Sequence, residues 1–222
     1  MWAVLVAAGK GERLGGERPK AFAPLGGRPL LAEPLERLDS CALIDAIVVV
    51  APPEWEEPAI LLAEEIGASK VVACVTGGIR SRAESVRIGV AEVPEDAHVI
   101  IVHDAARPLV SDEIVERVLA PLADGWDGVV PGLPISDTLK RAPGRTVTET
   151  VDRGDLFAVQ TPQAFLARSL RGALATFPED VTDCAGYVER AGGRVKVVDG
   201  DPRLVKVTTL GDLARVENLL EQ

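Results

Sequence analysis

Two glycines and several cations follow the first apolar run of the chain, in the segment AAGKGERLGGERPK. Gly9 and Gly11 allow backbone N–H groups to approach an anion closely, and Arg13 and Lys20 add full positive charges. The segment does not match the dinucleotide-binding pattern G-x-G-x-x-G, because Leu14 stands at the third glycine, and it lacks the G-K-[ST] of a P-loop. We predict a phosphate-binding loop; the alternative is a plain strand–helix turn with solvated cations.

A second segment, VHDAARP, places Asp104 just after an apolar strand expected at Val99–Val102. A carboxylate there can hold Mg²⁺, which is usually bound through one or two carboxylates together with waters and substrate phosphates. Arg107 is a candidate phosphate ligand, and His103 is expected to pack at the end of the strand rather than to act as a base. The alternatives are a helix N-cap for Asp104 and a surface ion pair of little energetic weight for Arg107.

Two further segments carry weaker signals. GGIRSRAESV follows the expected strand Lys70–Val75, and its Arg80, Arg82 and Ser85 are either ligand contacts or ordinary exposed and helical residues. Lys206 lies in the apolar stretch LVKVT, where a lysine needs a partner or a cavity. Its alternative role is that of an edge-strand lysine that discourages aggregation.

Apolar runs alternate with helical patterns along the chain, which predicts an α/β fold with a mostly parallel sheet and helices on both faces. Strands are expected at Trp2–Ala7, Ile44–Val50, Lys70–Val75, Val99–Val102, Gly128–Pro131, Arg194–Val198 and Leu204–Val207. Helices are expected at Leu30–Leu38, Glu54–Ile66, Arg82–Val90, Asp112–Leu122, Gln163–Ala175, Thr182–Ala191 and Leu210–Leu220. Ligands of such sheets bind beyond the carboxyl ends of the strands, where the segments described above begin.

Residues 132–156 depart from this alternation. The stretch is polar, with alternating residues at Thr146–Val151 and a turn at Pro143–Gly144, which predicts a protruding β-hairpin arm. The tip of such an arm has little core of its own, so we expect it to pack on something else, such as a second subunit. No repeat or long linker divides the chain, and one domain spanning residues 1–222 is expected.

Composition excludes several classes of function. The net charge of -10 argues against general nucleic-acid binding, and no apolar run approaches the ~20 residues of a membrane span. The first apolar run is short and has no basic lead, unlike a secretory signal. Three distant cysteines indicate no disulfide framework and fit a reducing cytoplasm, and only two histidines argue against a zinc site.

Taken together, these segments resemble the 2-C-methyl-D-erythritol 4-phosphate cytidylyltransferase family of the non-mevalonate isoprenoid pathway. VHDAARP with DT-x-K and VDR is the most specific part, whereas the first loop marks only the wider nucleotidyltransferase superfamily. The glycine loop before Ser85 is one residue longer than usual, and Ala21 and Gly186 stand where glutamine and serine are common. The matching segments follow the family's order over nearly the whole chain: AAGKGERLGGERPK, GG…RAESV, VHDAARP, PISDTLK, TVDR, TPQAF, VTDCAG and VKVTT.

The resemblance implies a Rossmann-like nucleotidyltransferase domain that transfers CMP from CTP to methylerythritol phosphate and releases pyrophosphate. It implies catalytic roles for Arg13 and Lys20, and Mg²⁺ bound at Asp104. The nucleotide contacts it implies are Ala7, Ala8, Gly9, Gly11, Gly78, Ser85, Asp104 and Ala105. The acceptor contacts it implies are Arg107, Thr138, Arg153 and Lys206. Thr138 and Arg153 would act across the interface of a homodimer formed through the arm.

Three alternatives remain at this point. A ribitol 5-phosphate cytidylyltransferase would use the same nucleotide loops, and another superfamily member would use a different nucleotide and a sugar 1-phosphate. A non-catalytic nucleotide-binding protein is the third, because a fold does not fix a function. The segments TVDR and VKVTT favour methylerythritol phosphate, and the joint presence of Arg13, Lys20, Asp104 and Lys206 favours an active enzyme.

Overall fold

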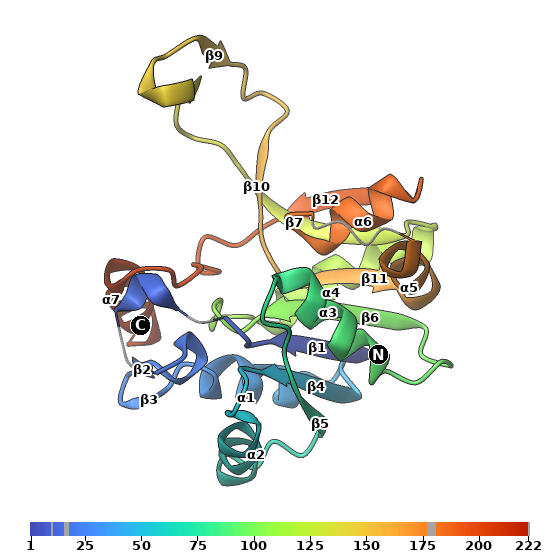
Figure 1. The fold of residues 1–222 in the computed structure, drawn as a ribbon. Helices are drawn as coiled ribbons and strands as arrows, with labels where there is room; N and C mark the ends of the chain where they lie inside the picture. Colours follow the sequence, from blue (N-terminus) through green and yellow to red (C-terminus); the bar gives the residue numbers. More distant parts are fainter. Residues whose placement is uncertain (10, 16–17, 177–180, 222) are drawn as a thin grey trace.

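The computed structural model describes residues 1–9, 11–15, 18–176 and 181–221. A mixed sheet at its centre has the strand order β10-β7-β11-β6-β1-β4-β5, with β12 also paired to β7 (Figure 1). Its strands are β1 (Trp2–Val6), β4 (Ala46–Ala51), β5 (Val71–Thr76), β6 (Val99–Asp104), β7 (Gly128–Pro134), β10 (Phe157–Val159), β11 (Gln163–Leu166) and β12 (Val195–Asp199). Strands β6, β1, β4 and β5 are parallel, whereas β11 runs antiparallel between β6 and β7.

Helices cover both faces of this sheet, as the sequence predicts. They are α1 (Ala32–Ser40), α2 (Glu56–Glu65), α3 (Arg82–Ala91), α4 (Asp112–Leu119), α5 (Ala167–Thr176), α6 (Cys184–Arg190) and α7 (Leu210–Leu220). Successive side chains of β1 point to opposite faces, so Ala3 and Leu5 join one core with α1, α2 and α4. Val4 joins a second core with α3, α5 and α6. Burial on both faces explains why the central strands are continuous apolar runs.

The parallel strands end level with one another at one edge of the sheet. Val6 pairs with Val50 of β4 and with Asp104 of β6, and Val50 pairs with Val75 of β5. The loops that follow these four strands therefore leave the sheet side by side. Helix α7 joins the same region through a small third core, in which Val207 and Val216 pack against Leu30.

The arm predicted at residues 132–156 projects away from the sheet (Figure 1). It contains β8 (Leu139–Arg141) and β9 (Glu149–Val151), which pair antiparallel with Leu139 opposite Val151. The chain returns through β10, whose Phe157 and Val159 are exposed. Short elements complete the chain: η1 (Glu12–Leu14), η2 (Lys20–Phe22), β2 (Pro24–Leu25), β3 (Arg28–Pro29), η3 (Ala120–Asp124) and η4 (Pro143–Arg145).

Two predicted elements are wrong. The helix expected at Gln163–Ala175 begins at Ala167, because the first four residues form β11, inserted between β6 and β7. Leu204–Val207 is not a strand, although it is apolar. Leu204 and Val207 are the buried pair and are three residues apart, which does not fit the two-residue period of a strand. Val207 instead donates its N–H to the carbonyl of Ala106 at 2.8 Å.

The described part of the chain includes no helix that is long and apolar enough to cross a membrane. Cys41, Cys74 and Cys184 are free thiols, and Cys41 and Cys184 are buried.

Candidate active site

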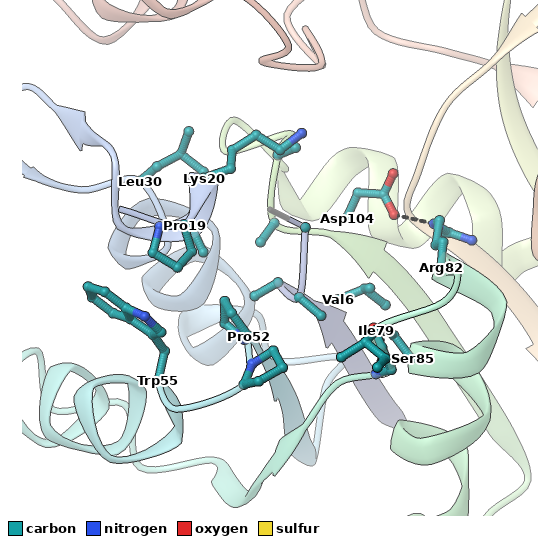
Figure 2. A pocket seen from close by; sticks show the side chains of 18 of the residues that line it. Val6, Pro19, Lys20, Leu30, Pro52, Trp55, Ile79, Arg82, Ser85 and Asp104 are labelled. Atoms are coloured by element: carbon teal, nitrogen blue, oxygen red, sulfur yellow. Dashed lines mark hydrogen bonds and ion pairs between the residues drawn. The ribbon is translucent and has the colours of Figure 1, made fainter. Parts of the chain in front are cut away.

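A cavity of about 660 Å³ lies at the edge where the parallel strands end (Figure 2). This volume is within the usual range for a small-molecule site. Its walls come from the loops after β1, β4, β5 and β6, together with Lys20 and Lys206. Pro52, Pro53 and Trp55, after β4, supply an apolar wall, and Figure 2 shows Trp55 on the side opposite Asp104.

Gly11 allows the first loop to fold back against Lys20. Its φ of +74° is rarely adopted by residues with a side chain, and a Cβ added there would lie 2.7 Å from Cβ of Lys20. Lys20 lines the cavity and donates from Nζ to the carbonyl of Val207 at 3.2 Å. Gly11 therefore shapes the site from behind, without lining the cavity itself.

Gly77 joins the loop after β5 to the first loop. A Cβ at this position would collide with the side chain of Ala8, and the Gly77 N–H bonds to the carbonyl of Ala51 at 2.8 Å. The next residue, Gly78, donates its N–H to the buried Ser85 hydroxyl at 3.1 Å. These contacts hold three loops together at the base of the cavity, where backbone groups and Ser85 meet.

Asp104 lies between two cations. Arg82 donates from Nε to Oδ1 at 2.7 Å, and Lys206 donates from Nζ to Oδ2 at 2.7 Å (Figure 2 shows the contact with Arg82). Burial by itself raises the pKa of a carboxyl group, but the charges of Arg82 and Lys206 outweigh this effect and hold the pKa of Asp104 well below its usual range. Asp104 is therefore an ionised carboxylate with a fixed orientation.

The backbone at Asp104 is fixed by a second set of hydrogen bonds. Its N–H donates to the Thr161 hydroxyl at 3.1 Å, and that hydroxyl is 3.1 Å from Nδ1 of His103. Nε2 of His103 lies 2.9 Å from the carbonyl of Arg107, which can only accept. Nε2 therefore carries the proton and Nδ1 accepts from Thr161. Burial lowers the pKa of His103 to about 4, so the ring is neutral and structural, as expected.

The cavity is strongly positive although the chain is acidic. Among the described residues that line it, Arg18, Lys20, Arg80, Arg82 and Lys206 are cations and Asp104 is the single carboxylate. Burial and then the ammonium of Lys206 lower the pKa of Lys20, and the carboxylate of Asp104 partly opposes them. This excess of positive charge suits a ligand with several phosphate groups.

Most of the predicted site residues meet at this cavity. Those that line it are Ala7, Ala8, Gly9, Lys20, Gly78, Ser85, Asp104, Ala105 and Lys206. Arg13 is exposed and does not line the cavity. Its charge nevertheless lowers the pKa of Lys20, although burial and Lys206 have larger effects. Thr138 and Arg153 are exposed residues of the arm.

Arg107 does not line the cavity of this chain. Its Nη1 donates to the carbonyl of Leu204 at 2.5 Å, and its Nη2 lies 3.5 Å from the carbonyl of Val159. These contacts anchor the segment that carries Lys206. The predicted contact between Arg107 and substrate remains a prediction.

The sequence offers Arg80 and Arg82 equally as possible ligand contacts, and Arg82 is not among the site residues that the resemblance implies. Arg80 and Arg82 have the same type and lie two positions apart, but Arg80 pairs with Glu84 whereas Arg82 reaches Asp104. The distinguishing signal is Ser81, whose hydroxyl caps α3 by accepting from the Glu84 N–H at 3.2 Å. This cap makes Arg82 the first residue of the helix and directs it toward the sheet edge.

Asp104 fits the role of a single protein ligand for Mg²⁺. The described residues contain no cluster of three or more metal-binding side chains, so most ligands would come from phosphate and water. A carboxylate has about four lone-pair sites, and Arg82 and Lys206 engage one on each oxygen. The remaining sites suit a cation that usually takes one or two carboxylates and substrate phosphates.

The family model described as 2-C-methyl-D-erythritol 4-phosphate cytidylyltransferase matches residues 1–222. A protein of that name from Nocardia farcinica is 44% identical over 221 residues, covering 99% of this chain and 94% of the relative. One from Frankia casuarinae is 43% identical, covering 98% of this chain and 80% of the relative.

Solved structures agree with these matches. A crystal structure of a 4-diphosphocytidyl-2C-methyl-D-erythritol synthase has a TM-score of 0.83 at 32% identity, covering 99% of this chain and 97% of its own. The 2-C-methyl-D-erythritol 4-phosphate cytidylyltransferase of Thermus thermophilus has a TM-score of 0.79 at 31% identity, covering 99% and 98%. The chain therefore belongs to the 2-C-methyl-D-erythritol 4-phosphate cytidylyltransferase family.

Proposed function

We propose that this chain transfers CMP from CTP to 2-C-methyl-D-erythritol 4-phosphate. The products are pyrophosphate and 4-(cytidine 5'-diphospho)-2-C-methyl-D-erythritol. The observation that carries the proposal is the cavity itself, in which cations surround one ionised carboxylate at the ends of parallel strands. Membership of the family supplies the identity of the nucleotide and the acceptor. A ribitol phosphate acceptor and an inactive nucleotide-binding protein have no comparable support.

The backbone around the cavity is suited to the nucleoside. Ala8 and Gly9 follow β1 and line the cavity. Gly78, in the loop after β5, lies beside the buried Ser85 of α3. Ala7 and Ala105 complete the lining between them. We assign the cytidine to this base of the cavity, which these small residues line.

The reaction needs little proton transfer. The second pKa of a phosphate monoester is about 6, so the acceptor phosphate is largely ionised at neutral pH. One of its oxygens attacks the α-phosphorus of CTP in line, a new P–O bond forms, and the bond to the β-phosphate oxygen breaks to release pyrophosphate. Catalysis then consists of holding the reactants and stabilising charge. The buried neutral His103 is not required as a base.

Lys20 and Arg13 are the proposed catalytic cations for the triphosphate. Lys20 lies in the cavity, and its pKa is lowered by burial and by Lys206. An incoming phosphate group relieves this repulsion and favours the charged ammonium. Mg²⁺ bound by Asp104 would supply further positive charge to the phosphates. Asp104 itself supplies a carboxylate of fixed orientation at the edge of the cavity.

A second copy of the chain completes the acceptor site in this proposal. Lys206 lines the cavity, but Thr138 and Arg153 lie on the projecting arm of the same chain. Leu156, Phe157, Val159 and Val197 leave apolar surface exposed near the base of the arm, which suits a protein interface. A homodimer that exchanges arms would cover this surface and bring Thr138 and Arg153 to the partner's cavity.

Acceptor and nucleotide choice can be measured by pyrophosphate release. The purified chain is incubated with Mg²⁺, one nucleoside triphosphate, and either methylerythritol phosphate or ribitol 5-phosphate. We expect the highest kcat/KM with CTP and methylerythritol phosphate. A higher kcat/KM with ribitol 5-phosphate, or with another nucleotide, would contradict the proposed substrates. We also infer a cytoplasmic location, which suits three free thiols.

A further inference from the structure

We propose that Arg82 is a positioning residue that holds the carboxylate of Asp104, while Lys206 is the exchangeable partner released when substrates bind. The inference rests on the proposed function, because it gives the two cations on one carboxylate different tasks. It follows from their contacts, their burial and the elements that carry them.

The guanidinium of Arg82 is held on more than one side. Besides the bond from Nε to Oδ1 of Asp104, Nη1 lies 3.6 Å from Sγ of Cys184, a fully buried residue at the start of α6. Nη2 is also buried and has no hydrogen-bond partner among the described residues. A planar group enclosed in this way cannot turn toward the cavity without leaving Asp104.

The backbone that carries Arg82 is equally constrained. Arg82 is the first residue of α3, which Ser81 caps. At Gly89 of the same helix, an added Cβ would lie 2.5 Å from Cγ1 of Val4 and 2.6 Å from Cγ2 of Val50. The helix thus packs against β1 and β4 without space for a side chain at position 89. This close packing holds the backbone of Arg82 in place.

Lys206 is less constrained by its surroundings than Arg82. It lies in the segment between β12 and α7, outside any helix or strand, and its side chain is 41% exposed compared with 26% for Arg82. It also repels Lys20, whose pKa it lowers after burial. A flexible lysine stem can move its ammonium from Asp104 to a phosphate oxygen, whereas Arg82 remains in place.

The two roles have a measurable consequence. If Arg82 is removed, Asp104 loses its fixed partner and keeps Lys206 as its neighbouring cation. The carboxylate is then less well oriented toward a metal ion, and Lys206 is less available to the acceptor phosphate. We expect Arg82→Gln to raise the KM for methylerythritol phosphate and lower kcat, with a smaller change in the KM for CTP.

Mn²⁺ binding gives a readout that does not depend on turnover. We would titrate Mn²⁺ into wild type, Arg82→Gln and Arg82→Lys in the presence of cytidine 5'-(α,β-methylene)triphosphate, and follow free Mn²⁺ by electron paramagnetic resonance. Loss of a residue that orients a metal ligand typically weakens metal binding by about 10- to 100-fold, and we expect this for Arg82→Gln. Arg82→Lys should lie between it and wild type, because it restores charge but not the anchored geometry.

The matched control is Arg37→Gln. Arg37 is also a part-buried arginine paired with a carboxylate, Glu33 at 2.6 Å, but it belongs to α1 and does not line the cavity. Wild-type Mn²⁺ affinity in Arg82→Gln, or tighter binding because a competing cation has been removed, would overturn the inference. If Arg82→Gln does not fold, Arg82→Lys decides by the same criterion. Failure of wild type to release pyrophosphate would instead contradict the proposed function.

Discussion

Lys206 reaches Asp104 across 102 residues of sequence, donating from Nζ to Oδ2 at 2.7 Å. The next residue extends the same connection, because the Val207 N–H bonds to the carbonyl of Ala106 and the Val207 carbonyl accepts from Lys20. A C-terminal segment therefore joins the first loop and the loop after β6. The site depends on the closing part of the chain as much as on the glycine-rich beginning.

Replacing Lys20 with alanine should reduce turnover. Lys20 is the proposed preorganised positive charge that faces the triphosphate in the cavity. Loss of one such donor typically lowers the reaction rate by about 10²–10³-fold. The measurement is kcat with saturating CTP, Mg²⁺ and acceptor. Lys196→Ala is the control, because Lys196 lies over Trp126 and does not line the cavity. A near wild-type kcat for Lys20→Ala would exclude its catalytic role.

Gly77→Ala should push the loop after β5 away from the loop after β1. Its added methyl group would meet Ala8 and the carbonyl of Ala51, and overpacking of this kind typically costs about 1–3 kcal/mol. We expect a lower melting temperature and a higher KM for CTP. Gly172→Ala is the control, because a Cβ there meets nothing within 4 Å in α5 and should be neutral or stabilising. Equal behaviour of the two variants would show that the close packing at Gly77 is unimportant.

Stability should fall as the pH is lowered from about 6.5 to about 4, in part because of His103. Burial lowers the pKa of His103 from 6.5 to about 4, so within this window the unfolded chain binds a proton that the folded chain does not. The contribution is at most about 3 kcal/mol. Chemical denaturation in metal-free buffer at several pH values measures it. His103→Gln should lack this part of the pH dependence; an unchanged slope would mean that other groups cause it.

Arm exchange between subunits predicts complementation of two inactive variants. In a mixed dimer of Lys20→Ala and Arg153→Ala, one site carries both defects and the other carries neither. Random subunit exchange in a two-fold dimer should then restore about a quarter of wild-type activity. Subunit exchange is verified with two different affinity tags. Demonstrated exchange without recovered activity would mean that Arg153 acts in its own chain.

Much of the fold can be predicted from the sequence because the central strands are buried on both faces. A continuous apolar run such as Ile44–Val50 is typical of a strand at the centre of a sheet that helices cover on both faces. Short apolar stretches are less informative. Gln163–Leu166 merges in sequence with the helix that follows it, and only pairing with β6 and β7 makes it a strand. Leu204–Val207 crosses the edge of the sheet, where its apolar side chains pack without strand pairing.

The site was predictable where a residue follows a strand and less so where contacts are long-range. Asp104 could be placed from the end of its strand alone. The cap at Ser81 is the one local signal that separates Arg82 from Arg80, whereas the contact of Arg82 with Asp104 is long-range. Arg107, whose contact with substrate stays a prediction, also holds the backbone at Leu204, which its sequence position does not reveal. Such contacts depend on how distant segments pack, which residue type and spacing do not specify.

A ³¹P nuclear magnetic resonance spectrum of the reaction mixture tests directly whether the chain transfers CMP to methylerythritol phosphate. The purified chain, CTP, methylerythritol phosphate and Mg²⁺ should produce a new diphosphodiester signal together with an equal amount of pyrophosphate, and neither should form when the acceptor is omitted. Pyrophosphate without the diphosphodiester, or an unchanged spectrum of CTP and acceptor, would contradict the proposed transfer.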